Sequence, residues 1–271
     1  MTEQTMDVAL TQQRVRGHWD PQPCDSQRSV REPASREFFL QVERQRYALQ
    51  PHILECQSWI SWRGRRVLEV GAGVGTDARQ LLRAGAIYTG ISLDCGSADM
   101  TARALREFHL PGASVQSDVT ALGFPDGMFD VVYSFGVLQD IPQVQRAVAE
   151  IGRVLKPGGE LLVMLHNRAS ITHRLARLAG LPARLGLPRR DAGGGVHPRC
   201  RVYGESEAAE LFAAFEVVRH EVRFFDHRPW GVLGRALPRS LRRWLGERWG
   251  RHRILHLRKT AERAASGSTG T

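Results

Sequence analysis

The residues best suited to chemistry lie in a glycine-rich stretch in which Gly71, Gly73 and Gly75 alternate with small residues. Apolar residues run into this stretch and residues 76–82 read as the start of a helix, so the glycines occupy a strand-to-helix corner. Glycine lacks a Cβ and tolerates positive φ, which allows close approach of a ligand to the backbone. The stretch therefore predicts a nucleotide-cofactor site, although such a turn alone is equally typical of a tight loop.

The sequence around this turn predicts the scaffold that must position it. Strands and helices alternate along the chain, which is typical of a parallel, doubly wound sheet that binds ligands at the carboxyl ends of its strands. The predicted strands cover residues 86–94, 113–118, 128–134 and 160–165, and the predicted helices cover residues 98–108 and 144–155.

Three motifs occur in order within this run, at residues 69–75, at residues 116–119 together with 124–130, and at residues 153–159. On these motifs the chain resembles the class I S-adenosylmethionine-dependent methyltransferases of the small-molecule type, over residues 65–165. A dinucleotide enzyme would lack the last two motifs. The resemblance implies an α/β fold, a Rossmann-like, seven-stranded and mostly parallel sheet with N-terminal helices and a lid insertion, and it implies S-adenosyl-L-methionine as the cofactor.

The resemblance also implies which residues hold the cofactor. Glu69 and the glycine turn would face its methionine part, and Asp118 and Val119 would flank the adenine, with a loop-capping role as the alternative for Asp118. The implied cofactor-binding residues are Glu69, Gly71, Ala72, Gly73, Thr76, Ser92, Leu93, Asp94, Asp118, Val119 and Ser134.

The chain departs from the family pattern at two places. Relatives carry an acidic residue for the ribose hydroxyls about 20 residues past the first glycine, whereas this chain has Ser92 there. Asp94 lies two residues further on the same face of the strand and could replace that carboxylate, or could instead cap the next helix. Many relatives have a histidine pair where this chain has Gln139 and Asp140, in a loop beside the transferred methyl group.

Several residues are candidates for catalysis or acceptor binding. Asp140 is a candidate base or amine anchor, with a helix-capping role as the alternative. His166 and His18 could each take a proton near neutral pH, although a lone histidine is more often a packing or surface residue. The candidate substrate residues are Tyr47, Gln139, Arg201 and Tyr203.

Composition limits the class of protein. Length and a hydrophobic fraction of 42% predict one α/β core with additions. Four scattered cysteines without a paired spacing predict free thiols and no metal site, and no membrane span or secretion signal is visible, so we expect a cytoplasmic protein. Residues 1–165 hold 17 basic and 19 acidic side chains, against 21 and 9 in residues 166–271. The basic half predicts a solvated surface, an anionic or carrier-bound acceptor, or a membrane-surface patch.

We expect five parts along the chain. They are residues 1–64 with helical spacing at 36–62, the cofactor-binding core at 65–165, a substrate-lid insertion at 166–204, completion of the sheet at 205–260, and a disordered tail at 261–271. Residues 237–249 show helical spacing with arginines between the apolar positions. They are predicted to pack on the sheet, with a membrane-surface helix as the alternative.

The sequence thus predicts a methyltransferase that acts on an oxygen or nitrogen atom of a small molecule in specialised biosynthesis. One alternative keeps the cofactor and changes the chemistry, to cyclisation or to transfer of the amino-carboxypropyl arm. Another is an RNA methyltransferase, but no RNA-binding module is recognisable and we expect no nucleic-acid partner. The oligomeric state is not predicted.

Overall fold

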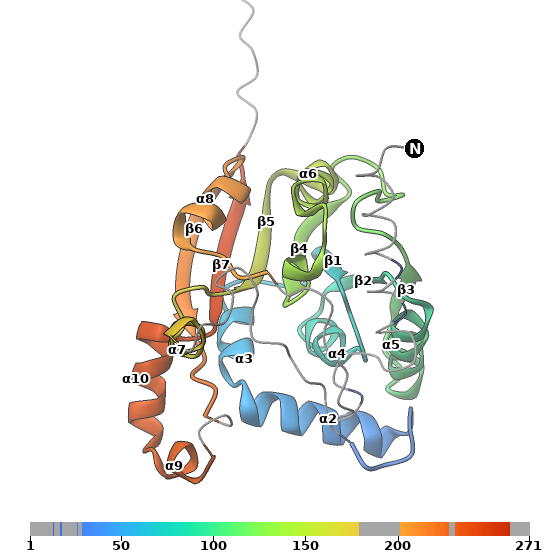
Figure 1. The fold of residues 1–271 in the computed structure, drawn as a ribbon. Helices are drawn as coiled ribbons and strands as arrows, with labels where there is room; N and C mark the ends of the chain where they lie inside the picture. Colours follow the sequence, from blue (N-terminus) through green and yellow to red (C-terminus); the bar gives the residue numbers. More distant parts are fainter. Residues whose placement is uncertain are drawn as a thin grey trace, which may run out of the picture.

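The computed structural model describes residues 29–178, 201–227 and 231–260, together with the isolated Gln13, Gly17 and Ser26. A seven-stranded sheet forms its centre, in the order β3-β2-β1-β4-β5-β7-β6 (Figure 1). Neighbouring strands are parallel except that β7 runs antiparallel to both β5 and β6. The strands are β1 (Arg66–Val70), β2 (Ile87–Ser92), β3 (Gly112–Gln116), β4 (Phe129–Phe135), β5 (Leu155–His166), β6 (Phe215–Arg223) and β7 (His252–Lys259). The predicted doubly wound, mostly parallel sheet is confirmed.

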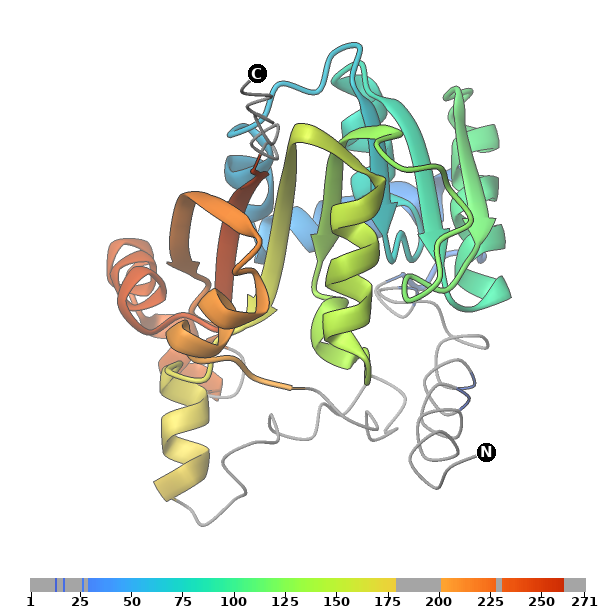
Figure 2. The ribbon, with the colours of Figure 1, turned by 90° about the horizontal axis from the view of Figure 1, so that it is seen from above.

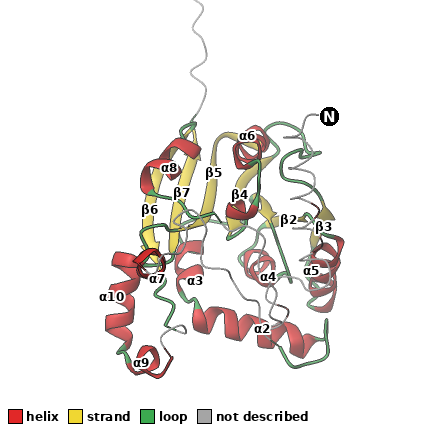
Figure 3. Ribbon diagram, in the orientation of Figure 1, coloured by secondary structure: helices red, strands yellow, loops and turns green. Residues whose placement is uncertain are grey.

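Helices cover both faces of this sheet (Figures 1 and 3). α6 (Val144–Val154) and α8 (Glu205–Leu211) lie on one face, and α3 (His52–Gln57), α4 (Thr76–Arg83) and α5 (Cys95–Glu107) lie on the other. α2 (Arg36–Leu49) packs across α4 and α5. Beyond β6 and β7 lie α7 (Ile171–Leu178), α9 (Gly231–Ala236) and α10 (Arg239–Trp249), on the same side of the molecule in both views (Figures 1 and 2).

The central strands are buried on both faces, which explains their nearly continuous apolar sequence. Alternate residues of β4 and β5 enter different cores: Val132 and Val163 pack in the core under α6 and α8, whereas Val131 and Leu162 pack in the core under α3, α4 and α5. This two-sided packing fixes where the strands end, and therefore where loops from β1, β2 and β4 meet.

Several predicted ends of helices and strands differ from those in the structure. The helical spacing of residues 36–62 covers two helices, because α2 ends at Leu49 with Gln50 as its C-cap, and Pro51 caps α3. Residues 156–159 belong to β5, where the predicted strand began only at residue 160. α10 begins at Arg239, and its buried Gly246 lies against the backbone of Phe224 and Phe225 at the end of β6. Its predicted packing on the sheet is therefore confirmed.

Some predictions fall outside the described residues. They are the tail at 261–271, the middle of the insertion at 179–200, and His18. The division of the chain into five parts stays a prediction. Within the described ranges, none of the helices combines the length and the apolar character needed to cross a bilayer.

Candidate functional site

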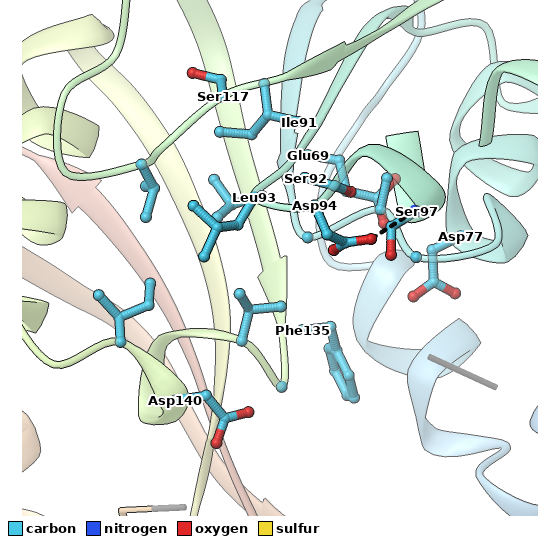
Figure 4. A pocket seen from close by; sticks show the side chains of 18 of the residues that line it. Glu69, Asp77, Ile91, Ser92, Leu93, Asp94, Ser97, Ser117, Phe135 and Asp140 are labelled. Atoms are coloured by element: carbon cyan, nitrogen blue, oxygen red, sulfur yellow. Dashed lines mark hydrogen bonds between the residues drawn. The ribbon is translucent and has the colours of Figure 1, made fainter. Parts of the chain in front are cut away.

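A cleft lies where β1, β2 and β4 end, as expected for a sheet of this type (Figure 4). Its open space, counted out to bulk solvent, is about 1130 Å³. Of the predicted cofactor residues, ten line it and Ser134 does not, because the Ser134 side chain is fully buried in the adjacent core. The ten are Glu69, Gly71, Ala72, Gly73, Thr76, Ser92, Leu93, Asp94, Asp118 and Val119.

The glycine turn forms the floor of the cleft. Gly71 has a φ of 81°, and a Cβ at this position would lie 2.3 Å from Cγ2 of Val137, which follows β4. Gly75 caps α4 with a φ of 71°. The Gly71 amide donates a hydrogen bond to the Ile91 carbonyl at 2.8 Å, which ties the turn to β2. Both the conformation and the space at Gly71 therefore require glycine.

Glu69, the last residue but one of β1, carries a buried carboxyl group. The Tyr88 hydroxyl donates a hydrogen bond to Glu69 Oε2 at 2.6 Å. Burial, and then the negative charge of nearby Asp77, raise the pKa of Glu69 to about 8. A cationic group placed beside Glu69 would restore its ionised form, because an opposite charge favours the carboxylate.

Asp77 organises a second network that the sequence did not reveal. Arg46 of α2 forms an ion pair with Asp77 Oδ2 at 2.7 Å, and both Arg46 and Asp77 line the cleft. The Tyr47 hydroxyl donates to Asp77 Oδ1 at 2.8 Å and the Tyr133 hydroxyl donates to Oδ2 at 3.0 Å. Tyr47, a predicted substrate residue, does not line the cleft and instead holds α2 against α4. Asp77 could have been suspected from its place in the first turn after the glycines, whereas Arg46 had no sequence signal.

The β2 end of the cleft carries Ser92 and Asp94, the two residues considered for the ribose hydroxyls. Asp94 accepts a hydrogen bond from the Ser97 amide at 2.6 Å, so it caps α5, and it also lines the cleft (Figure 4). Both roles considered for Asp94 are therefore open to the same side chain. The hydroxyls of Ser92 and Thr76 are buried without a hydrogen-bond partner. Two such hydroxyls in one cleft are suited to a polar ligand that would satisfy them.

Asp118 and Val119 lie at the far end of the cleft, after β3. One oxygen of Asp118 accepts hydrogen bonds at 2.8 Å from both the amide and the hydroxyl of Thr120. Asp118 thus caps its loop while it borders the cleft, and the Val119 side chain is buried beside it. A flat apolar ring with a polar edge would fit between the polar Asp118 and the apolar Val119.

Across the cleft, the wall is mostly apolar. Phe135, Val137, Ile141 and Pro142 line it, and Asp140 is the acidic residue among them (Figure 4). Gln139, the neighbour of Asp140, is 1% exposed, and neither its amide oxygen nor its amide nitrogen has a hydrogen-bond partner. A buried amide in this state is uncommon, because the lost hydrogen bonds to water are not replaced.

Behind Phe135 lies a cluster of histidines. His52 Nε2 and His252 Nδ1 are 2.9 Å apart, and the rings of His166 and His252 stack with centroids 6.1 Å apart. The Phe135 ring contacts His52 and His252. Burial, with the charges of Arg46 and Arg223, lowers the pKa of His52 to about 3, so His52 is neutral near pH 7.

The structure separates the remaining predicted residues from the cleft. His166 is buried, lies outside the cleft lining, and accepts a backbone hydrogen bond from Tyr203. Tyr203 is buried beside β5, and exposed Arg201 donates its backbone amide to the Gln139 carbonyl at 3.0 Å. Among the described residues, no group of three or more histidine, cysteine or acidic side chains is placed to hold a metal ion.

The cleft residues fit the cofactor that the sequence predicted. Buried acidic groups beside Arg46 suit the ammonium and carboxylate of a methionine, and the unpartnered Ser92 and Thr76 hydroxyls suit polar atoms of a ribose or amino acid. The loop at Asp118 and Val119 suits an adenine. No part of the lining carries a group that would exclude such a ligand by an unavoidable charge clash.

Comparison with known proteins agrees with this fit. Residues 68–163 match the family described as methyltransferase domain. The sterol 24-C-methyltransferase of Gibberella zeae is 32% identical over 170 residues, covering 58% of this chain and 41% of that protein. The phosphatidylethanolamine N-methyltransferase of Cereibacter sphaeroides is 35% identical over 112 residues, covering 40% and 53%. The chain thus spans about half the length of these relatives, or less.

The fold extends beyond the matched residues. The crystal structure of geranyl diphosphate C-methyltransferase from Streptomyces coelicolor A3(2), in complex with Mg²⁺, geranyl diphosphate and S-adenosyl-L-homocysteine, aligns with a TM-score of 0.63. The alignment covers 92% of this chain and 98% of that one at 14% identity. At this identity the similarity establishes the shared fold alone.

Proposed function

Since the chain carries a domain of the class I S-adenosylmethionine-dependent methyltransferase family, we propose that it methylates a lipid-like small molecule at an oxygen or nitrogen atom. The observation that carries the proposal is the cleft itself. It combines a glycine turn that admits no side chain at Gly71 with buried acidic groups and an apolar wall across from them. These features suit the cofactor on one side and an apolar acceptor on the other.

When bound, S-adenosylmethionine supplies a methyl group on a positively charged sulfur, and in-line attack by the acceptor breaks the sulfur–carbon bond and leaves S-adenosylhomocysteine. The protein therefore positions the reactants and excludes water. Glu69, Asp77 and Arg46 would hold the methionine part, Asp94 and Ser92 the ribose, and Asp118 and Val119 the adenine. An acceptor oxygen or nitrogen that carries a proton must also lose it.

Asp140 is the residue we propose to take that proton. It lies in the cleft wall, in the 3-10 turn Leu138–Asp140 that follows β4. The Gln139 amide next to it is buried behind the lining of the cleft, so offering its donor and acceptor atoms to a polar group of the acceptor would require another conformation. His166 does not line the cleft, and its proposed role as a base would require another conformation.

The acceptor class follows from the wall and from the relatives. Phe135, Val137, Ile141 and Pro142 offer an apolar surface, which favours a hydrophobic acceptor. The two relatives described above are named for a sterol and for phosphatidylethanolamine, both of which are lipids. An acceptor that presents a hydroxyl or amine on a hydrophobic body satisfies both observations.

The test is to incubate the purified full-length protein with S-adenosylmethionine and, separately, with the lipid and water-soluble extracts of its host. Mass spectrometry follows both products. S-adenosylhomocysteine together with a mass gain of one methyl group in the lipid extract supports the proposal. Methylthioadenosine would instead indicate transfer of the amino-carboxypropyl arm or cyclisation, and a methylated product in the water-soluble extract alone would contradict the lipid-like acceptor.

The base is tested with Asp140→Asn, and Asp126→Asn serves as the control because Asp126 is an exposed aspartate outside the cleft. Loss of a general base lowers kcat by about 10²–10⁴-fold, with cofactor affinity retained. Asp126→Asn should leave both kcat and cofactor affinity unchanged. If Asp140→Asn weakens cofactor binding while the bound enzyme turns over normally, Asp140 is not the base.

A further inference from the structure

The exposed apolar side chains of this protein are unevenly distributed. Eleven large hydrophobic side chains are exposed among the described residues, and five of them lie on three short helices beyond β6 and β7. These five are Leu175 and Leu178 on α7, Val232 on α9, and Leu241 and Trp244 on α10. Leu178 and Val232 are more than four-fifths exposed. We call these side chains, with the exposed Arg174 of α7 and the exposed Arg239, Arg243 and Arg248 of α10, the basic apolar surface.

The charge of these helices is strongly one-sided. Their sequences contain seven arginines and a single acidic residue, Glu247. Glu247 is already paired with Arg243 of its own helix and with Arg223 of β6. Arg239 and Arg248 are exposed on α10. The surface therefore presents positive charge next to Leu241 and Trp244.

α10 has two different faces. Its buried Gly246 packs closely against Phe224 and Phe225, and α10 contacts β6. The Trp244 side chain is half exposed on the other face, where its ring meets Trp249 edge to face at 5.5 Å. An ordinary solvated face would carry charged side chains at these positions. Tryptophan and leucine among arginines are typical of helices that lie in the interface of a bilayer.

The surface also borders the acceptor side of the cleft. Asn167, just after β5, bonds through its side chain to the Gly250 carbonyl at 2.9 Å and through its amide to the Arg251 carbonyl at 2.7 Å. It thereby joins the end of α10 to the segment that leads into α7. The next residue, His252, contacts Phe135 of the cleft wall. A body docked on the surface would therefore lie near the side from which an acceptor enters.

From these observations we propose that the basic apolar surface docks on an anionic lipid membrane, with Leu241 and Trp244 in the headgroup region and the arginines on lipid phosphates. The proposal rests on the proposed function in one respect only: a lipid-like acceptor resides in such a membrane, which gives the docking its purpose. Docking would deliver that acceptor to the cleft without any membrane-spanning segment. The interaction is electrostatic and hydrophobic together, so it should weaken in high salt and fail on neutral lipid.

Vesicle sedimentation tests this proposal with the full-length protein and without cofactor or acceptor. We expect binding to vesicles of phosphatidylcholine mixed with phosphatidylglycerol, and weak binding to phosphatidylcholine alone. Replacing Arg239 and Arg248 by glutamine should weaken binding roughly thirty-fold, and Leu241→Ala with Trp244→Ala should weaken it by at least about tenfold. The control pair, Arg103→Gln with Arg106→Gln on exposed positions of α5, should bind like the wild type.

Other outcomes would overturn the proposal. Equal binding to neutral and anionic vesicles, no binding to either, or equal losses in the α10 and α5 arginine pairs would each contradict it. A dimer in light scattering that Trp244→Ala converts to a monomer would assign the surface to a second copy of the chain. Cofactor affinity, measured by calorimetry on the same variants, should stay unchanged. If the protein binds anionic vesicles but not S-adenosylmethionine, the proposed function fails while the docking surface stands.

Discussion

The two sides of the cleft bury polar groups of different kinds. On the β1 and β2 side these groups are charged or acidic, namely Glu69 with Tyr88 and Asp77 with Arg46. On the β4, β5 and β7 side they are mostly neutral, namely His52, whose pKa is lowered to about 3, and the amide of Gln139, with Asp140 as the acidic residue in the wall. A cofactor with a fixed zwitterionic end calls for fixed charges, whereas a hydrophobic acceptor calls for a mostly apolar wall.

This difference extends to the backbone. The first side depends on a turn that only glycine can form, and the second side has no comparable constraint beside the cleft except the turn at Gly136, with a φ of 83°. Binding of an unvarying ligand can therefore be inferred from a short local motif. The second side is built from β4, β5, β7 and α3, which are distant in the chain, so no short motif reveals it.

The largest effect is expected from Gly71→Ala, which disturbs the backbone of the glycine turn on the β1 and β2 side. The new methyl group would sit 2.3 Å from Val137 Cγ2 in a left-handed conformation. We expect a loss of about 4 kcal/mol in the free energy of unfolding and a fall in cofactor affinity of at least about 100-fold. Urea denaturation and calorimetry measure the two quantities. Gly123→Ala is the control, because a Cβ there meets nothing within 4 Å. Equal effects at both positions would refute the special role of the turn.

The second largest effect is expected from removing a charge on the β1 and β2 side. Asp77→Asn leaves Arg46, whose side chain is 14% exposed, without its ionic partner. We expect a loss of about 3 kcal/mol in the free energy of unfolding, because a buried cation is left uncompensated. Asp99→Asn is the control, since the exposed pair of Asp99 and Arg103 should contribute less than about 1 kcal/mol. Similar losses at both aspartates would show that burial does not distinguish the two pairs.

The sequence predicted the first side well for a physical reason. A glycine-rich turn and an alternation of strands and helices are local patterns, and they predicted the sheet and the corner at which the cleft lies. The eleven cofactor residues were assigned by resemblance to the family; ten of them line the cleft, whereas Ser134 does not and is fully buried. Asp77 lies just after the glycine motif and was missed, since its importance comes from three partners on α2 and β4.

The second side could not be predicted in the same way. His52, Phe135 and His252 are separated by up to 200 residues, and only the folded chain brings them together. Tyr47 was assigned to the substrate because of its position in a lid helix, but it holds Asp77. The basic half of the chain was recognised from composition, whereas the concentration of exposed apolar side chains on α7, α9 and α10 needed the structure.

The contrast between the two sides also predicts opposite responses to pH, and the acidic side should give the larger one. The pKa of Glu69 is about 8 in the folded protein and 4.5 as its ordinary value. Between these values the folded protein holds a proton that the unfolded chain releases, so stability falls as pH rises from about 4.5 to about 8. At pH 7 the cost is about 3 kcal/mol. Urea midpoints of the ligand-free protein across this range should fall with pH, and Glu69→Gln should remove the slope. If the urea midpoint of the wild type stays constant across this pH range, the raised pKa of Glu69 is disproved.

The smallest effect is expected from the histidine pair, in the opposite direction. The pKa of His52 is about 3 when folded, against an ordinary 6.5, because of burial and the charges of Arg46 and Arg223. Below pH 6.5 His52 binds a proton in the unfolded chain but not in the folded protein, so stability falls as pH drops from 6.5 towards 3. At pH 5 the loss is about 2 kcal/mol. Replacing His52 by phenylalanine, which can keep the packing on Phe135 and Phe224, should remove this part of the acid slope. His109→Phe, at an exposed position just after α5, should retain it. If both variants keep the full slope, then His52 and His252 do not make the acceptor side acid-sensitive, and the difference between the two sides rests on Glu69 alone.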